Sequence, residues 1–301
     1  MAVATEPRPA KLPLPGGSAR ATVRVHPILT GEMHAPPAHT DRPEGRLAGA
    51  RIAAHMVGRR AGWNWLPVPA FLVEHPTAGA LLIDTGLHPV CERDVAANMG
   101  RAAKLLYEVR MEHDQALRFA LPARGVQPGE IRLVILTHMH VDHASAVSEF
   151  PNATFVVDRR EWEAAGAGGA RQGYHHRQFD HAFDWRTVDY GSGEVQSFAG
   201  FGRTLDLLGD GSVRLISTPG HTPGHQSVVL RTATREVLIV GDAGYTEREL
   251  RGETRPLVVA DEHRRRRSIS EISGYRRQTP DALVIPSHDW LLWPQLQGVY
   301  E

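Results

Sequence analysis

The chain has 301 residues, of which 42% are hydrophobic and 23% are charged, enough for one large globular domain with a buried core. Its 34 basic and 34 acidic side chains balance, which argues against a dedicated nucleic-acid or membrane-surface protein. A single cysteine, Cys91, excludes an intrachain disulfide framework, and the absence of a long apolar run indicates a cytoplasmic protein without a membrane span or signal peptide.

The first third of the chain predicts a tail, a strand, a long loop and a hairpin. Residues 1–20 are rich in proline, alanine and glycine and are predicted to form a flexible tail before a single domain at residues 21–301. Apolar and polar residues alternate over 21–29, which predicts the first strand. Residues 30–69 are predicted as a loop whose tryptophans, Trp63 and Trp65, either form the lip of a binding site or cover the edge of the core. Residues 70–74 and 80–84 predict a hairpin that ends at Asp84.

Residues 90–121 are predicted to be mainly helical, because apolar side chains recur there with a period near 3.6 residues and Pro122 ends the pattern. A short apolar run at residues 133–136 follows and predicts a buried strand. Further strands are predicted at 154–157, 206–208, 213–216, 227–230, 236–240 and 281–286, with helices that begin at Asp158 and span 261–278.

The strand predicted at 133–136 leads directly into His138-x-His140-x-Asp142-His143. On an extended segment, side chains two positions apart point to the same side, so His138, His140 and Asp142 can converge on one point. Three imidazoles and a carboxylate at this spacing favour a metal site, with zinc as the default ion. The alternative is a polar turn that happens to be rich in histidine.

Three later apolar runs also end close to a histidine or an aspartate. His221 and His225 follow the run at 213–216, Asp242 follows the run at 236–240, and His288 follows the run at 281–286. In layered α/β proteins, functional sites gather at strand ends and in the loops beyond them. We therefore expect these side chains to join the first motif.

This ordered set of motifs, from about residue 21 to 290, resembles the metallo-β-lactamase superfamily. The phrase Pro219-Gly-His-Thr-Pro-Gly-His-Gln-Ser227, Tyr245 after Asp242, and Ser287-His288-Asp289 resemble the N-acyl homoserine lactonases most closely within it. The resemblance implies an α/β protein with the metallo-β-lactamase fold, a four-layer αββα sandwich. It also implies a dinuclear centre with two zinc ions, for which manganese, cobalt or iron are alternatives.

The resemblance assigns His138, His140 and His221 to one metal and Asp142, His143 and His288 to the second, with Asp242 bridging the two. It implies that Asp84 orients a ligand, although a turn-capping aspartate is the alternative. His225 and Asp289 are assigned to the shell around the ligands, or are strand-end polar residues satisfied by the backbone.

The activity implied by the resemblance is opening of the ring of N-acyl homoserine lactones, which is quorum quenching, by attack of a metal-bridging hydroxide. Tyr245 would stabilise the oxyanion, and Asp142 would carry the proton to the leaving ring oxygen. The alternative for Tyr245 is a buried aromatic side chain without a role in the reaction. The expected partner is a small-molecule ester or lactone, and a homodimer is also considered. Five side chains either line a groove for an acyl chain or belong to the core: Met99, Leu105, Leu106, Tyr107 and Met111.

Other functions use the same ligand set and stay open. They are thioesterases of the glyoxalase II type, phosphotriesterases, arylsulfatases and other lactonases. A nuclease is disfavoured by the balanced charge, because the one basic run, Arg264 to Arg267, is typical of a solvated helix face. An iron oxidoreductase of the superfamily usually has glutamate at the position of His140. A non-catalytic metal-binding module is a further alternative.

One departure from the superfamily is Ala144-Ser145-Ala146, where two glycines commonly stand.

Overall fold

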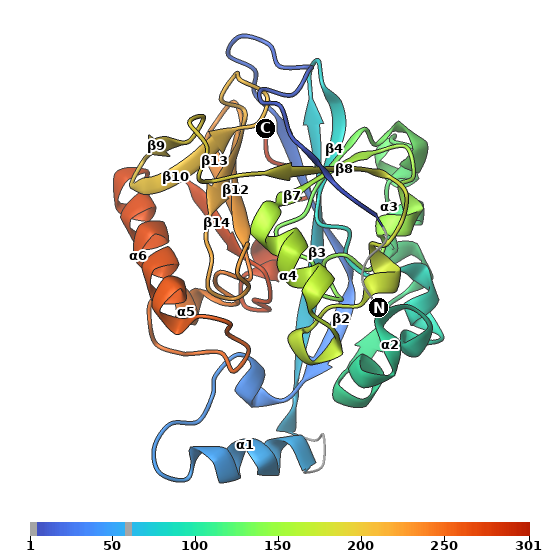
Figure 1. Ribbon diagram of the computed structural model, residues 1–301, viewed down its shortest axis with the longest axis vertical. Helices are drawn as coiled ribbons and strands as arrows, with labels where there is room; N and C mark the ends of the chain where they lie inside the picture. The colour runs from blue at the N-terminus through green and yellow to red at the C-terminus, as the bar shows by residue number, and fades with distance from the viewer. Residues whose placement is uncertain (1–4, 58–61) are drawn as a thin grey trace.

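Two β-sheets lie face to face in the computed structural model, which describes residues 5–57 and 62–301 (Figure 1). The first sheet has the strand order β1-β8-β7-β6-β4-β3-β2-β5. Its strands are β1 Arg8–Pro9, β2 Arg24–Ala35, β3 Asn64–His75, β4 Gly79–Ile83, β5 Glu108–Arg110, β6 Leu133–Ile135, β7 Thr154–Asp158 and β8 Asp184–Val188. The second sheet has the order β14-β13-β12-β11-β10-β9. Its strands are β9 Gln196–Phe198, β10 Phe201–Asp206, β11 Val213–Ser217, β12 Gln226–Arg231, β13 Glu236–Gly241 and β14 Leu283–Pro286.

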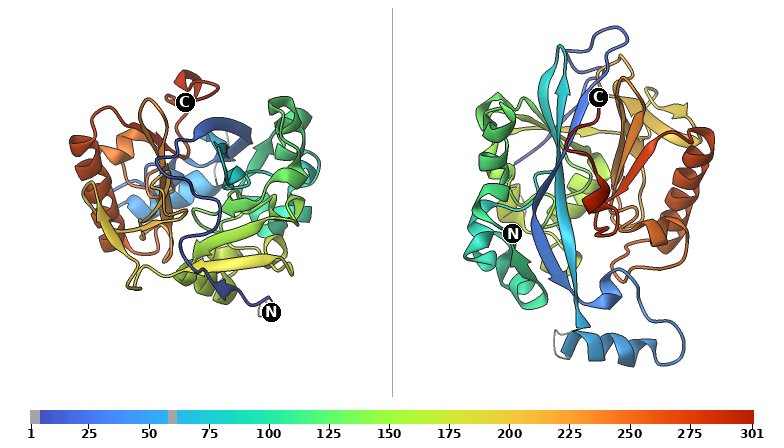
Figure 2. Two further views of the ribbon diagram at one scale, coloured as in Figure 1. Left: turned by 90° about the horizontal axis from the view of Figure 1, so that it is seen from above. Right: turned by 180° about the vertical axis from the view of Figure 1, so that it is seen from behind.

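Helices cover the outer face of each sheet (Figure 2). The α-helices are α1 Ala48–Val57, α2 Val95–Leu106, α3 Leu117–Ala120, α4 Arg159–Ala167, α5 Glu247–Leu250 and α6 Glu262–Gln278. The 3-10 helices are η1 Pro37–His39, η3 Pro89–Glu92, η4 His113–Gln115, η5 Pro122–Arg124, η6 Pro128–Glu130, η7 Val147–Glu149, η8 Ala170–Gln172, η9 His176–Gln178 and η10 Trp293–Gln295. No helix among the described residues is long and apolar enough to cross a membrane.

Apolar clusters between and outside the sheets hold these layers together. Side chains such as Ile83 and Leu215 fill the space between the two sheets. Trp162 of α4 packs with Phe155 on the outside of the first sheet, and Ile272 of α6 packs on the outside of the second. The layers therefore run helix, sheet, sheet, helix, which confirms the predicted α/β architecture and the αββα sandwich. β6 is apolar throughout because the strand is covered on both faces.

Residues 5–20 lie against the sandwich, so the predicted flexible tail is wrong for these positions; residues 1–4 of that prediction lie outside the described residues. β1 pairs in parallel with β8, and the backbone N–H of Leu14 donates to the carbonyl of Leu207 at 2.8 Å. Ala10, Leu12 and Leu14 alternate and pack on the core between the sheets. Their burial offsets the conformational entropy lost when the segment is ordered.

Three other expectations require correction. The predicted loop at 30–69 contains the second half of β2, the helix α1 and the first part of β3. The two strand segments pair with each other and extend beyond the rest of the sheet (Figure 1). The predicted helix at 90–121 is divided, because Gly100 has a φ of 85° inside α2 and the chain then forms β5 along the edge of β2. This edge pairing outweighs the local helical periodicity. The strand predicted at 206–208 ends earlier, at Asp206.

Candidate metal centre

The strands β4, β6, β13 and β14 deliver their following residues to one edge of the sandwich. β4 and β6 run parallel in the first sheet, and β13 and β14 run parallel in the second. The residues after β6 carry the His-x-His-x-Asp-His motif, and those after β13 and β14 carry Asp242 and His288. Parallel strands place their carboxyl ends at the same side, so these side chains meet although they are far apart in sequence.

The structure brings all seven predicted ligands together in two adjoining clusters. Each side chain is buried, and the candidate ligand atoms of each cluster lie within 4.8 Å of one another. The first cluster is His138, His140, His221 and Asp242, and the second is Asp142, His143 and His288.

Asp242 lies between the two clusters. Its Oδ2 is 3.3 Å from Nε2 of His221, while its Oδ1 is 3.2 Å from Nε2 of His143 and 3.3 Å from Nε2 of His288. One carboxylate oxygen thus faces each cluster. This position is the one expected of a bridging ligand.

Unsatisfied buried atoms test whether these residues fit a pair of cations. Asp142 Oδ2, His143 Nε2, Asp242 Oδ1 and His288 Nε2 are buried without a hydrogen-bond partner among the described residues. Such groups are costly unless they bind something, and native proteins seldom leave them unpaired. In the other cluster, Nε2 of His221 is only 2.8 Å from Nδ1 of His140. Converging imidazole nitrogens and carboxylate oxygens are the donors that zinc takes, so the residues fit a dinuclear metal site.

In the first cluster, the protonation of the buried histidines agrees with that fit. Burial lowers the pKa of the His138 and His221 imidazoles well below the usual value, which favours the neutral form that ligates metals. Burial alone would raise the pKa of the Asp242 carboxyl, but the surrounding histidines hold it well below the usual range. His221 Nδ1 lies 3.2 Å from the carbonyl oxygen of Val258, so we assign the proton to Nδ1, which leaves Nε2 free to ligate.

Asp84 positions the His138-x-His140-x-Asp142-His143 motif through hydrogen bonds. Its carboxylate accepts hydrogen bonds from the Thr137 backbone N–H at 2.7 Å and the Thr137 hydroxyl at 2.8 Å, and lies 2.7 Å from Nδ1 of His143. Its φ of 56° is a conformation that few non-glycine residues adopt. This network turns Nε2 of His143 toward the second cluster, which agrees with the orienting role implied by the family resemblance.

The two other residues expected around the ligands differ from each other. His225 lies beside the cluster, with its ring centroid 5.2 Å from that of His138 and its Nδ1 2.9 Å from the Thr218 hydroxyl. Asp289 instead accepts hydrogen bonds from the backbone N–H groups of Glu247 and Leu291, both at 2.8 Å. Asp289 therefore matches the alternative of a strand-end residue satisfied by the backbone.

Glu161 is a buried residue of the site that the sequence analysis did not identify. Its Oε1 accepts from the backbone N–H of Met139 at 3.0 Å and from the Tyr174 hydroxyl at 3.1 Å, while its Oε2 accepts from the backbone N–H of Gly224 at 3.2 Å. Met139 lies between His138 and His140, and Gly224 follows His221 by three positions. One carboxylate thus ties together the two loops that supply the first cluster.

Ser145, where the superfamily commonly has glycine, links the motif to α2. Its hydroxyl donates to Oδ1 of Asn98 at 2.6 Å and accepts from the backbone N–H of His88 at 3.0 Å. The side chain of Asn98 donates back to the Ser145 carbonyl at 2.9 Å. The departure from glycine therefore leaves the clusters intact and fixes α2, which forms one wall of the adjacent cavity.

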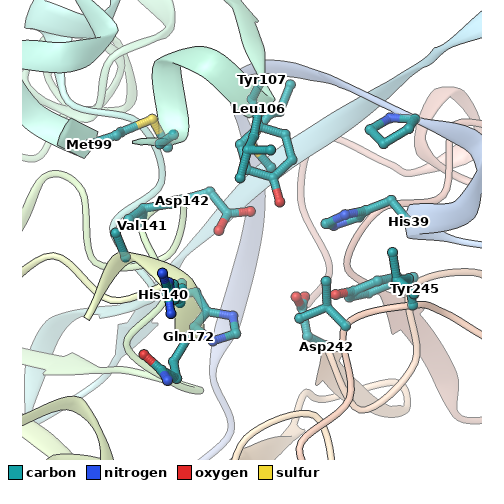
Figure 3. A pocket seen from close by; sticks show the side chains of 18 residues that line it. His39, Met99, Leu106, Tyr107, His140, Val141, Asp142, Gln172, Asp242 and Tyr245 are labelled. Carbon is teal, nitrogen blue, oxygen red and sulfur yellow. The ribbon is translucent and has the colours of Figure 1, made fainter. Parts of the chain in front are cut away.

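A cavity of about 240 Å³ opens onto both clusters (Figure 3). Its apolar wall comes from β2, α2 and the segments at 141 and 257–258, through Met33, Met99, Ala103, Leu106, Val141, Leu257 and Val258. Its polar side chains include His39, Tyr107, His140, Asp142, Gln172, Asp242 and Tyr245. Of the five side chains between 99 and 111 that were expected either to line a groove or to belong to the core, Met99, Leu106 and Tyr107 line the cavity. Leu105 is instead 77% exposed, and Met111 is buried in the core.

The tryptophans of the predicted lip lie elsewhere. Trp65 stacks on His34 with a centroid distance of 4.5 Å. With Trp63, it lines a second pocket of about 490 Å³ that reaches His288 and Asp289 from another side. Neither tryptophan lines the cavity in front of the two clusters.

Comparison with known proteins gives a consistent assignment. Residues 63–288 match the family model of the metallo-β-lactamase superfamily. N-acyl homoserine lactonase AttM of Azorhizobium caulinodans is 31% identical over 246 residues, which cover 78% of this chain and 88% of the relative. AttM of Agrobacterium fabrum is 32% identical over 243 residues, covering 78% of this chain and 87% of that protein.

Solved structures agree on the fold. An N-acyl homoserine lactone hydrolase with the product N-hexanoyl-L-homoserine at its catalytic metal centre superposes with a TM-score of 0.72 at 22% identity, covering 92% of this chain and 97% of the other. AidC, a dizinc quorum-quenching lactonase, gives a TM-score of 0.58 at 15% identity, with 94% of both chains covered. The chain is thus a metal-dependent hydrolase of ester bonds and belongs to the metallo-β-lactamase superfamily.

Proposed function

We propose that this enzyme opens the lactone ring of N-acyl homoserine lactones in the cavity above the two His/Asp clusters. The observation that carries this proposal is an apolar cavity, lined by Met33, Met99 and Leu106, that ends on the clusters and on the Tyr245 hydroxyl. Such a cavity accepts an acyl chain while the polar end reaches the reacting groups. The names of the relatives at 31–32% identity support the same substrate class.

We assign His138, His140 and His221 to one metal ion, Asp142, His143 and His288 to a second, and Asp242 to both. Zinc is the default ion for these donors, and a structural neighbour is described as a dizinc lactonase. When bound, a metal pair supplies Lewis acidity and lowers the pKa of a water so that a nucleophile exists at neutral pH. The unpaired buried atoms around the second cluster and the close approach of the imidazole nitrogens in the first support this assignment.

Tyr245 is suited to donate a hydrogen bond to the lactone carbonyl oxygen as negative charge develops there. Burial raises the pKa of its phenol well above the usual value, so the hydroxyl stays protonated at neutral pH. The hydroxyl lies 3.4 Å from Nδ1 of His221, and that nitrogen is already directed to the Val258 carbonyl. The phenolic proton is therefore available to the substrate.

Asp142 is suited to carry the proton to the leaving ring oxygen. Its carboxylate lines the cavity, and its Oδ2 lies 3.6 Å from Nε2 of both His143 and His288. Figure 3 shows this carboxylate pointing into the cavity across from Tyr245. A group placed between the cluster and the substrate can take a proton from the attacking water and return it to the alkoxide.

A pH-indicator assay tests the proposal, because ring opening produces a carboxylic acid and releases a proton at neutral pH. The purified, metal-loaded enzyme is offered N-hexanoyl-L-homoserine lactone, an unsubstituted lactone, a glutathione thioester and an aryl phosphotriester. We expect the highest kcat/KM with the acyl homoserine lactone. Turnover of the thioester or phosphotriester without lactone hydrolysis would reject the proposed substrate and leave the enzyme class unchanged.

A further inference from the structure

Three aromatic side chains that line the cavity contact one another: His39 and Tyr245 lie across from His140, and Tyr107 packs against His39 (Figure 3). The ring of His39 stacks on Tyr245 with a centroid distance of 5.3 Å and an interplanar angle of 2°. The ring of Tyr107 meets the same imidazole edge-on at 5.6 Å. His39 therefore lies between Tyr245, which is assigned to the reaction, and Tyr107, a second phenol that lines the cavity.

The backbone around His39 fixes this position. Its N–H donates to the carbonyl of Pro36 at 2.8 Å, which closes η1. The carbonyl of the preceding residue, Ala38, accepts from the N–H of Leu257 at 3.0 Å, which joins η1 to the 257–258 segment of the cavity wall. The backbone of η1 and the ring stack thus place the imidazole at the cavity wall.

The imidazole nitrogens of His39 and the hydroxyl of Tyr107 have no hydrogen-bond partner within residues 5–57 and 62–301, and because both side chains line the cavity these atoms stay accessible to a ligand. Burial and the neighbouring His288 lower the pKa of the His39 imidazole to about 4, against the opposing effect of Asp142 and Asp242. The ring is therefore neutral at neutral pH and offers one N–H donor and one nitrogen acceptor. Burial also raises the pKa of the Tyr107 phenol, which stays protonated.

Unpaired polar atoms that face a largely apolar cavity are expected to hydrogen-bond a ligand that fills it, because a ligand without polar atoms there would displace their water without replacing its hydrogen bonds. His39 lies between Tyr245, which is assigned to the lactone carbonyl, and Tyr107, so a ligand group that meets the imidazole has to lie close to the reacting carbonyl. The secondary amide of an N-acyl homoserine lactone is attached to the carbon next to the lactone carbonyl, and it has one N–H donor and one carbonyl acceptor. A plain alkyl chain has neither and would leave the imidazole unpaired.

We propose that His39, assisted by the Tyr107 hydroxyl, hydrogen-bonds the amide of N-acyl lactones and so makes the enzyme selective for lactones that carry an acylamino group. This inference rests on the proposed lactonase function and adds the residues that read the substituent on the ring. His39 is a specificity-determining residue here, because the amide it contacts is not the bond that breaks.

The test compares two lactones that differ only at this group: N-hexanoyl-L-homoserine lactone and α-heptyl-γ-butyrolactone, in which methylene groups replace the amide. The variant His39→Phe keeps a flat ring to stack on Tyr245 but removes both nitrogens. We expect kcat/KM for the amide substrate to fall roughly 5- to 100-fold, mostly through KM, and kcat/KM for the alkyl lactone to change less than about twofold. Tyr107→Phe is expected to give a smaller loss in the same direction.

Two measurements separate this role from a structural one. Metal content by mass spectrometry is expected to be unchanged in His39→Phe. Calorimetric titration of the metal-loaded variant with the ring-opened product, N-hexanoyl-L-homoserine, is expected to show binding weakened by a factor similar to the loss in kcat/KM. Met33→Leu is the matched control, because Met33 lines the same cavity and carries no hydrogen-bonding proton. This control is expected to affect both lactones equally.

Equal losses on both lactones in His39→Phe would overturn the inference, since the histidine would then act by supporting Tyr245. Unchanged kinetics on both would overturn it as well. Neither result touches the proposed lactonase activity, which instead fails if the unmodified enzyme opens no lactone.

Discussion

Replacing Glu161 by glutamine tests whether the two ligand loops depend on one buried carboxylate. Both carboxylate oxygens accept a backbone N–H, from Met139 at 3.0 Å and from Gly224 at 3.2 Å. The glutamine amide has the same shape but only one acceptor oxygen, so one of these N–H groups must face an NH₂ group. A buried hydrogen bond to a charged acceptor contributes about 1.5–3 kcal/mol, so we expect a loss of about 2 kcal/mol in the metal-loaded state.

The loss divides between two measurable quantities. If the metal-free loops relax fully, metal affinity falls by the whole amount, which is about 30-fold at 1.36 kcal/mol per factor of ten. If they do not relax, the metal-free protein loses the same free energy of unfolding. Chelator competition measures the first quantity and urea unfolding of the metal-free protein measures the second. The two losses should sum to about 2 kcal/mol.

Glu163→Gln supplies the matched control for this experiment. Glu163 is on the same helix, α4, but its carboxylate is exposed and pairs with Arg159 on the surface. An exposed pair contributes little, so this variant is expected to match the unmodified protein. If Glu161→Gln also kept its metal affinity and its urea midpoint, the carboxylate would not position the loops and the reasoning would be refuted.

Three further predictions follow from the site and the fold. Asp242→Asn should lower both bound metal and turnover, measured by mass spectrometry and lactone hydrolysis; full turnover without metal would contradict the assigned chemistry. Tyr245→Phe should reduce kcat about 100-fold with metal content unchanged, and an unaltered kcat would remove Tyr245 from the reaction. Burial would raise the pKa of Asp210, but hydrogen bonds from Ser212, Ser18 and His75 hold it at about 2. This group therefore stabilises the fold above about pH 4, and the contribution is lost as the pH falls toward 2. Asp210→Asn should flatten the pH dependence of urea unfolding across that window, whereas an unchanged slope would show no such linkage.

The convergence of the seven histidine and aspartate side chains was predictable because each follows a short apolar run. A run of this kind forms a strand, and strand ends meet at one edge of a sandwich. β6, β13 and β14 behave in this way, so His138, Asp242 and His288 come together. The two layers of helices were likewise predictable, since helical periodicity or a capping aspartate marks α4 and α6.

Glu161 and His39 were not predictable, because nothing local distinguishes them. Glu161 lies in the first turn of α4, where an acidic residue is ordinary, and its function depends on where that helix docks. His39 follows two prolines in a segment without periodicity, and only the contact of η1 with Leu257 brings it to the cavity. The N-terminal segment was mispredicted for a related reason: composition indicated disorder, but Leu12 and Leu14 find an apolar edge that composition does not reveal.

The two clusters lie where the two sheets meet, and this position affects the stability of the native form and its resistance to proteases. One sheet supplies His138, His140 and His143, and the other supplies Asp242 and His288, so an ion held by both fastens the two halves to each other. Binding of this kind protects the native form by mass action, by about 2.7 kcal/mol when the free ion is at a hundred times its dissociation constant. We therefore expect that, when metal is scarce, proteases cleave the chain where the two sheets meet before the apolar core of the sandwich unfolds.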